Sequence, residues 1–322
     1  MTWTAVAPAR ALGRRPLRVA FGDDALVLFR DGQAIRALPD RCPHRMARLS
    51  GGTVRDGVIE CPYHGWQFDG TGRCRAIPGH AGDLPTIQLK RWEVAAKDGI
   101  LFVATHGTTT EPYVHGVTGK PPVLRLVESR TRGTVLDVAE NILDATHTHY
   151  THRGLLRGLS AQRYRVRVDI TGGDDWVEAR YTGEDRQHGL ISALLDSDRA
   201  VSVGRFRAPG IAELEFWGKR GLKLSTTFHL RPDGTDHTAG IGILAGPREA
   251  GLAHLKALLF LPFFRIALEQ DRRILQQCAE NTPTGQKPVI GPLDFLREDI
   301  ARIMAGQRPR AADSPQARSI LL

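Results

Sequence analysis

Four residues that can bind a soft metal ion fall into two pairs along the chain. The first pair, Cys-x-His, and the second, Cys-x-x-His, are made up of Cys42, His44, Cys61 and His64. Two thiolates and two neutral imidazoles from two short loops suit a two-iron cluster in which one iron binds sulfur and the other binds nitrogen. A proline follows each cysteine and stiffens the turn, and Gly65 lets the backbone come close to the cluster. The spacing therefore predicts an iron–sulfur cluster with mixed ligands.

Two other interpretations of these four residues are weaker. A Cys₂His₂ zinc site has a pair of cysteines followed by a pair of histidines, whereas here each pair is mixed. Unrelated core residues would have to take this spacing by chance. We therefore expect a Rieske [2Fe–2S] cluster.

A second group of candidate metal ligands lies further along the chain. It consists of Asn141, Asp144, His147, His149 and His152. If residues 134–147 form a helix, Asp144 and His147 share one face, and His152 follows just beyond the last turn. Two histidines and a carboxylate that leave open positions suit a mononuclear non-heme iron(II) site. His149 competes by spacing, although helical geometry turns it away from Asp144 and His147.

The candidate carboxylate ligand lies on a helix predicted at residues 255–280. One stripe of this helix carries Phe260, Phe264, Ala267, Asp271, Ile274 and Cys278, so that Asp271 faces inward with apolar neighbours. Because a buried carboxylate without a metal or a partner is costly, Asp271 is a ligand candidate. An ion pair with Arg165, Arg167 or Arg205 is the alternative.

The elements that must position these residues form two predicted domains. Residues 1–105 contain short strands and turns, with hairpins at 26–38 and 87–104, which indicates a small all-β domain. Residues 106–121 are rich in Thr, Gly and Pro and are expected to be a linker. Residues 122–322 combine alternating strands with helices at 134–147, 255–280 and 293–305. The second domain is therefore predicted as α+β, an antiparallel sheet with a long C-terminal helix (helix-grip, START-like) and room for a ligand between them.

Net charge, apolar runs and cysteine usage limit the classes of function that fit the chain. The chain has 322 residues, and its net charge of +9 is scattered, which argues against nucleic-acid binding and favours the steering of an acidic electron-transfer partner. The apolar run 257–264 is too short to span a membrane. Cys74 and Cys278 are isolated, so no disulfide framework is expected and a cytoplasmic location is favoured.

At this point the chain resembles a known family, the oxygenase (α) subunits of Rieske non-heme iron oxygenases of the aromatic ring-hydroxylating or demethylating type. The resemblance rests on the cluster ligands, the Asn141…Asp144-x-x-His147-x₄-His152 segment and the late Asp271, in this order. It implies His147, His152 and Asp271 as the ligands of the mononuclear iron. It implies Asp144 as a bridge to a cluster histidine of the neighbouring subunit in a homotrimer, and Asn141 as a residue close to the iron.

The resemblance implies a terminal oxygenase that hydroxylates or oxidatively demethylates an apolar, aromatic or polycyclic small molecule, with monooxygenation favoured over dioxygenation. A separate ferredoxin or flavin reductase must supply electrons, because the chain has no nucleotide-binding glycine motif. The pocket is expected to be lined by Phe206, Leu214, Phe216 and Phe264. The alternatives are a non-catalytic Rieske electron carrier fused to a ligand-binding domain, and a zinc-stabilised binding module.

Overall fold

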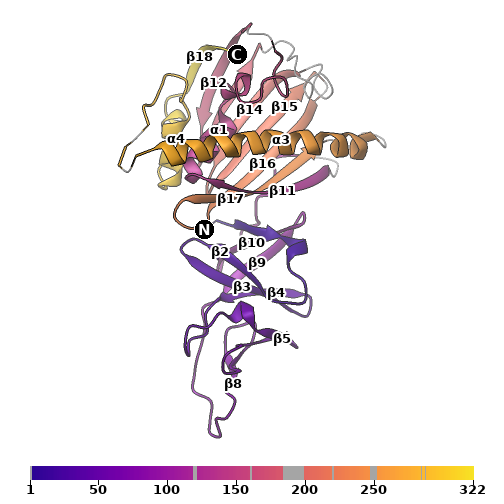
Figure 1. The fold of residues 1–322 in the computed structure, drawn as a ribbon, viewed down its shortest axis with the longest axis vertical. Coiled ribbons are helices and arrows are strands. Elements are labelled where there is room, and N and C mark those ends of the chain that lie inside the picture. The colour runs from indigo at the N-terminus through magenta and orange to yellow at the C-terminus, as the bar shows by residue number, and fades with distance from the viewer. Residues whose placement is uncertain are drawn as a thin grey trace. The chain divides into compact units, whose positions relative to one another are not determined.

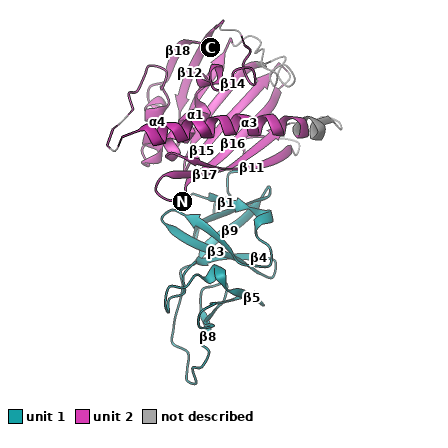
Figure 2. Cartoon of the chain, in the orientation of Figure 1, with its two compact units in different colours: residues 1–114 teal, residues 115–322 magenta. Residues whose placement is uncertain are grey.

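The computed structural model describes residues 2–118, 122–159, 162–183, 199–219, 221–246, 252–283, 285–286 and 288–322. The chain divides into two compact units, Met1–Val114 and His115–Leu322 (Figure 2).

Unit 1 is all-β, as predicted. Its six-stranded sheet has the order β1-β10-β9-β4-β3-β2, and a four-stranded sheet has the order β5-β6-β7-β8. The strands are β1 (Thr4–Pro8), β2 (Leu17–Phe21), β3 (Asp24–Asp31), β4 (Ala34–Pro39), β5 (Thr53–Arg55), β6 (Val58–Glu60), β7 (Gln67–Phe68), β8 (Cys74–Ala76), β9 (Trp92–Lys97) and β10 (Ile100–Thr105). The predicted hairpin at 26–38 is confirmed as β3 and β4. The predicted strand at residue 87 begins only at Trp92, because Gln88 instead forms an isolated bridge with Arg73.

Two apolar cores hold unit 1 together. One contains Leu26 and Leu28 of β3 with Leu101 of β10. The other packs Cys42 and Cys61 among fully buried side chains such as those of Leu49, Ile59 and Phe68. Both cysteines of the predicted cluster site are therefore part of a buried apolar core.

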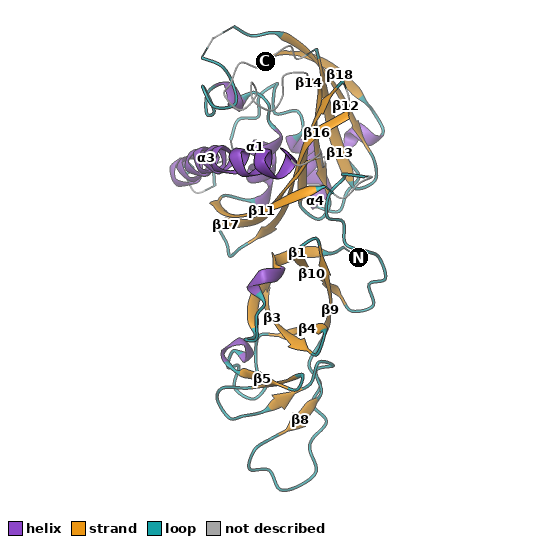
Figure 3. Cartoon of the chain, turned by 90° about the vertical axis from the view of Figure 1, so that its right-hand side faces the viewer, coloured by secondary structure: helices purple, strands orange, loops and turns teal. Residues whose placement is uncertain are grey.

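Unit 2 contains, among its described residues, one eight-stranded antiparallel sheet of order β11-β17-β16-β15-β14-β13-β12-β18. The strands are β11 (Val123–Arg132), β12 (Arg165–Gly172), β13 (Trp176–Thr182), β14 (Arg199–Arg207), β15 (Ile211–Gly218), β16 (Gly221–Pro232), β17 (His237–Gly246) and β18 (Gln316–Leu321). The helices are α1 (Val135–Leu143), α3 (Leu252–Asn281) and α4 (Arg297–Met304). Figure 1 shows α3 crossing the face of the sheet, and the turned view of Figure 3 shows it on one side of the sheet. The predicted α+β arrangement is confirmed.

The core of unit 2 lies on the face of the sheet that the helices cover. Val166, Val168 and Ile170 alternate along β12 and pack in one cluster with Leu143 of α1 and Ile300 of α4. Strand β18, which the sequence does not predict, forms the edge beside β12. Of its residues only Ile320 is buried, so its sequence carries almost no apolar signal.

Helix α1 is shorter than the sequence predicts. The predicted helix runs to residue 147, but α1 ends at Leu143, and Asp144 has extended φ and ψ of −75° and 116°. The Asp144 carboxylate accepts the N–H groups of Thr146 at 2.7 Å and His147 at 3.1 Å. Such side chain–backbone bonds compete with the helix and start a new turn, the 3₁₀ segment His147–His149.

Helix α3 confirms the predicted long helix but corrects its inward stripe. Phe260 and Ala267 are buried as predicted. Ile274 is 41% exposed and Cys278 is exposed, so the prediction is wrong at these two positions. Because the helix turns every 3.6 residues, the buried face has moved to Leu275, which packs against the core. Among the described residues no helix is long and apolar enough to cross a membrane.

Candidate functional site

Two loops of unit 1 carry the predicted cluster ligands, and both make the same backbone turn. In the first loop, the N–H of Cys42 donates to the carbonyl of Ala47 at 2.8 Å, and the N–H of Met46 donates to the carbonyl of Cys42 at 2.8 Å. The second loop, which starts at Cys61, repeats these bonds at 2.8 Å and 3.0 Å. Met46 and Gly65 occupy equivalent positions with φ of 59° and 69°. The loops are thus two copies of one ligand-presenting turn.

The histidines of the two loops lie side by side. The ring of His44 lies 4.6 Å from that of His64 and stacks on Trp66 at 4.8 Å. Gly65 is required in the second turn, because its φ is positive and a Cβ atom there would lie 2.9 Å from Pro78.

The protonation of these side chains fits a metal cluster. Burial and the neighbouring Cys61 thiol raise the pKa of Cys42 to about 11, so metal must displace a proton from this thiol. Desolvation, together with His44 and Arg45 nearby, lowers the pKa of His64 and keeps its imidazole neutral. Two buried, close thiols and two adjacent imidazoles are the donor set of a Rieske cluster.

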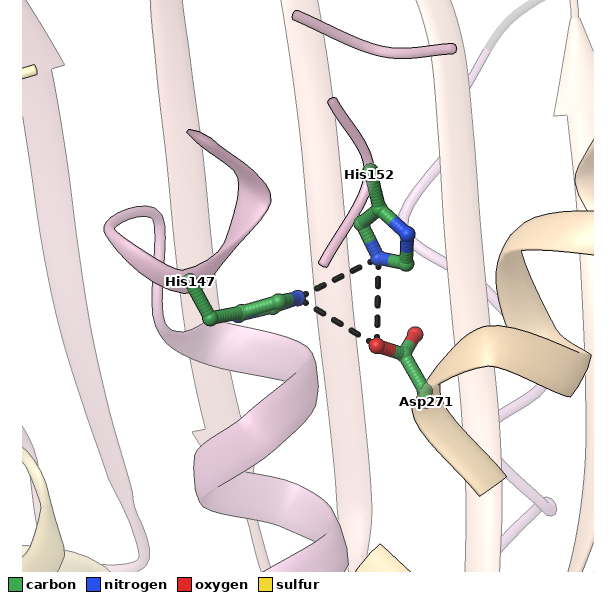
Figure 4. Close-up of side chains that lie close together, drawn as sticks. All are labelled: His147, His152 and Asp271. Atoms are coloured by element: carbon green, nitrogen blue, oxygen red, sulfur yellow. Dashed lines mark hydrogen bonds and ion pairs between the residues drawn. The ribbon is translucent and has the colours of Figure 1, made fainter. Parts of the chain in front are cut away.

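In unit 2, His147, His152 and Asp271 converge on one point (Figure 4). The Nε2 atoms of His147 and His152 are 3.3 Å apart, and Asp271 Oδ1 lies 3.4 Å and 3.1 Å from them. Donors roughly 2.1 Å from one ion and at right angles to each other are about 3.0 Å apart, so these distances suit one face of a metal ion. Asp271 Oδ1 is buried and forms no hydrogen bond within the described part of the chain.

The charges around this group favour a cation at its centre. Burial alone would lower the pKa of His147, but the carboxylates of Asp144 and Asp271 outweigh it and raise this pKa to about 9. Burial would raise the pKa of Asp271, but the adjacent imidazoles of His147 and His152 lower it to about 2. A proton on His147 therefore neutralises the carboxylates of Asp144 and Asp271, as a bound metal ion would.

The broken helix positions His147. Asp144 holds the turn that starts at Thr146, and its Oδ2 lies 3.4 Å from Nδ1 of His147. The predicted pairing of Asp144 with His147 thus occurs in the structure, but through a turn and not along a helix.

Three residues that support the ligands were missed by the sequence analysis. Arg157 is 8% exposed, and its Nε donates to Thr148 Oγ1 at 2.9 Å. This bond joins the loop of His152 to the turn of His147. Gln270 Oε1 lies 2.8 Å from Nδ1 of His152. In the sequence, Arg157 stands out only as an arginine after a histidine-rich segment, and Gln270 only as a glutamine beside an acidic candidate. Neither pattern is specific.

The remaining candidates lie elsewhere. Asn141 lines a second cavity of about 600 Å³ that Asp144 also lines. His149 ends the 3₁₀ turn, and its side chain is not in the converging group. Of the arginines considered as partners of Asp271, Arg167 pairs with Asp169, and Arg205 pairs with Glu178, Glu213 and Glu215.

The three converging side chains stand on the wall of a mainly apolar cavity of about 180 Å³. Its other walls include Leu214, Phe216, Phe228, Phe260 and Phe264. Phe206, which the sequence analysis also placed there, is fully buried in the core instead. Thr226 Oγ1 is buried at this wall without a hydrogen-bond partner in the described residues. A smaller engineered apolar cavity, of about 150 Å³, holds benzene, so a ring fits here.

Comparison with known proteins identifies a domain family in each unit. Residues 2–93 match the Rieske [2Fe-2S] domain, and residues 133–302 match the vanillate O-demethylase oxygenase C-terminal domain. The chain is a Rieske non-heme iron oxygenase family member. Its family identifies the cofactors as a Rieske [2Fe–2S] cluster and a mononuclear iron.

Individual relatives match different shares of the chain. The oxygenase component of dicamba O-demethylase from Stenotrophomonas maltophilia is 36% identical over 77% of this chain and 74% of its own length. Protein TIC 55 from Arabidopsis thaliana is 31% identical over 68% of this chain, and 4beta-methylsterol monooxygenase from Methylococcus capsulatus is 35% identical over 44%. The match spans only 42% and 41% of the lengths of these two proteins.

Solved structures share the fold. Dicamba monooxygenase bound to 3,6-dichlorosalicylic acid aligns with a TM-score of 0.79 at 18% identity, over 94% of this chain and 96% of that one. NdmA from Pseudomonas putida with caffeine aligns with a TM-score of 0.73 at 21% identity, over 93% and 88%.

Proposed function

We propose that this chain is the terminal oxygenase component of a multicomponent system that inserts one oxygen atom of O₂ into an apolar, aromatic or polycyclic small molecule, by hydroxylation or oxidative demethylation. One observation carries the proposal: His147, His152 and Asp271 present metal donors on the wall of an apolar cavity. A site that only stored or passed electrons would have no need of such a cavity.

In this proposal, each cofactor has its own ligands. Cys42 and Cys61 bind one iron of the cluster, and His44 and His64 bind the other. His147, His152 and Asp271 bind the mononuclear iron, which supplies the reaction with O₂ when it is bound. Asn141 is proposed to lie near the iron when the site is assembled.

The protein's own residues orient and enclose the reactants. Asp144 holds His147 in place through the turn bonds described above. Phe216, Phe228 and Phe264 exclude water and bind the apolar body of the substrate. Thr226 has a buried hydroxyl on the same wall, so a substrate with a hydrogen-bonding group directed at it gains affinity.

The proposed partners are a ferredoxin or flavin reductase as electron donor and two further copies of the chain. In the homotrimer that the family resemblance implies, Asp144 links the iron site to a cluster histidine of the next subunit. The unpaired Cys74 and Cys278 suit a reducing compartment, and we place the protein in the cytoplasm.

The proposal is tested with purified protein whose cluster has been reduced. The protein is mixed with O₂ and a panel of aromatic methyl ethers and fused-ring compounds, and cluster reoxidation and products are followed. We expect fast reoxidation only with a substrate. Hydroxylation should leave one atom from ¹⁸O₂ in the product, whereas demethylation of a methyl ether should release that atom with the methyl carbon as formaldehyde and leave an unlabelled phenol. Two labelled atoms would show dioxygenation, and reoxidation that no compound accelerates would contradict an oxygenase.

Iron content separates the proposal from a Rieske electron carrier fused to a ligand-binding domain. A [2Fe–2S] cluster and a mononuclear site together hold three irons per chain, whereas a carrier holds two. The absence of any iron–sulfur absorbance would instead favour a zinc-stabilised binding module.

A further inference from the structure

Each ring nitrogen of His152 faces one of two neighbouring residues of α3. Its Nδ1 atom lies 2.8 Å from Oε1 of Gln270, and its Nε2 atom lies 3.1 Å from Oδ1 of Asp271. His152 is 2% exposed, so its ring has little freedom to turn and no bulk water to bond. One dipeptide of α3 therefore touches both nitrogens of the same ligand ring.

These contacts select one tautomer of His152. An amide oxygen can only accept, so Nδ1 of His152 must carry the proton when it bonds Gln270 Oε1. The lone pair of the neutral ring is then on Nε2, which faces His147 and Asp271. The opposite orientation of the amide would donate to Nδ1 and leave a proton on Nε2, where it would block a metal ion.

The two histidines have different outer partners. The Nδ1 atom of His147 faces the charged carboxylate of Asp144, whereas that of His152 faces the neutral amide of Gln270. With iron(II) bound, the charges of Asp144 and Asp271 equal the charge of the ion. A neutral residue at position 270 keeps that balance.

We propose that Gln270 is a positioning residue of the mononuclear metal centre: it fixes the tautomer of His152 for metal binding and, because it is neutral, holds the iron in its ferrous state. This inference rests on the proposed function, since it takes the three converging side chains as iron ligands. Outer partners of ligand histidines typically change metal affinity by roughly 10- to 100-fold and tune the potential of the metal.

The test compares two substitutions of Gln270 in the full chain with its cluster intact. Gln270→Leu removes the acceptor and should weaken Fe(II) binding roughly 10- to 100-fold, measured anaerobically by competition with a chelator. Gln270→Glu keeps an acceptor and adds a negative charge. It should bind Fe(II) within about threefold of the wild type, but shift the Fe(III)/Fe(II) potential to more negative values, measured by redox titration of the ferric electron paramagnetic resonance signal.

Gln276→Leu is the matched control. Gln276 lies on the same helix and bonds Arg272 and Glu280, so this variant also loses side-chain hydrogen bonds but should keep wild-type Fe(II) affinity and potential. If Gln270→Leu fails to fold, the potential of Gln270→Glu decides. Wild-type affinity in Gln270→Leu, or an unchanged potential in Gln270→Glu, would overturn the role of Gln270.

A fourth variant separates this inference from the proposed function. If Asp271→Ala loses Fe(II) while Gln270→Leu binds it normally, only the role of Gln270 fails. If Asp271→Ala also binds Fe(II) normally, the ligand assignment fails, and with it the proposed oxygenase site.

Discussion

The carboxylates of Asp144 and Asp271 lie on either side of His147, and a positive charge between them determines how stable the site is. In the metal-free protein, the proton of His147 supplies that charge, which is why its pKa is raised to about 9. A bound metal ion replaces the proton and leaves the imidazole neutral. Metal and proton therefore compete for the same position.

This competition predicts a pH dependence of stability in the metal-free protein. The pKa of His147 rises from 6.5 to about 9 on folding, so its contribution is complete below pH 6.5 and is lost as the pH rises through 9. The pKa of Asp271 falls from 3.8 to about 2, so its contribution is present above pH 3.8 and is lost towards pH 2. We expect the thermal midpoint of the metal-free protein to fall between pH 6.5 and 9. The zinc-loaded protein should not show this fall, and parallel profiles for the two forms would contradict the model of competition.

Substitution of Asp271 tests the ligand group directly. Asp271→Ala should lose the mononuclear iron and all turnover, because two histidines alone hold iron(II) weakly, while the cluster spectrum stays unchanged. Glu269→Ala is the control, since Glu269 lies two residues away on α3 but pairs with Arg272 and Arg273 at the surface. Iron content and activity are measured on the same samples. Activity retained in Asp271→Ala would show that this carboxylate is not a metal ligand.

At the scale of elements, each site is built from turns that interrupt or leave regular structure. The cluster loops repeat one hydrogen-bonded turn, and the proposed metal centre uses the turn after α1 together with one face of α3. Such turns place ligands precisely because their backbone bonds are internal, while the sheet and α3 supply rigidity.

The cluster loops allow a matched pair of cysteine variants. Cys42→Ser or His64→Ala should abolish the Rieske-type electron paramagnetic resonance signal of the reduced protein, because each removes one ligand of an iron. Cys74→Ser should keep the signal, since Cys74 is buried in the same core but its thiol donates to the carbonyl of Ala76 at 3.7 Å. A signal that survives in Cys42→Ser, or vanishes in Cys74→Ser, would refute this ligand assignment.

Because Asp144 holds the turn after α1 and is not one of the proposed ligands, its substitution should differ in effect from that of a ligand. Asp144→Asn keeps an oxygen that can accept the N–H of Thr146, so the turn and both metal centres should remain. It removes the charge that orients His147 and, in the proposed trimer, the link to the next subunit. The pre-reduced cluster should then fail to reoxidise with substrate and O₂ in rapid-mixing absorbance. Wild-type reoxidation, or iron loss as complete as in His147→Ala, would rule out this role.

At the scale of the whole molecule, the net charge of +9 bears on electron delivery. A basic protein attracts an acidic electron carrier, and salt screens that attraction over about 10 Å at 0.1 M ionic strength. Charge of this kind affects the rate of encounter more than the final affinity.

We therefore expect the rate of cluster reduction by an acidic ferredoxin to fall several-fold between roughly 0.02 M and 0.3 M salt. Reduction by a small neutral reductant should change little over the same range, which controls for effects of salt on the cluster itself. Stopped-flow absorbance of the cluster measures both rates. Equal salt dependence for the two donors would show that charge does not steer this encounter.

The sequence alone predicted the candidate ligands, their order and most of the regular elements. Cys-x-His and Cys-x-x-His pairs are short local patterns, and alternating apolar residues predict strands such as β12 and β13 without knowledge of their neighbours. The inward face of Asp271 also followed from helical periodicity within α3. These features depend on residues close together in the chain, so a local reading is sufficient.

Which distant groups meet depends on tertiary packing, which no local pattern shows. The turn at Asp144 overrides the expected helix because its carboxylate bonds the backbone ahead of it, and the edge strand β18 forms because β12 offers it an open edge. The contact between Gln270 and His152 spans 118 residues of sequence, and no local pattern encodes it. Packing of α3 against the sheet brings these residues together, since burial of its apolar face fixes the helix where its polar residues meet the histidine turns.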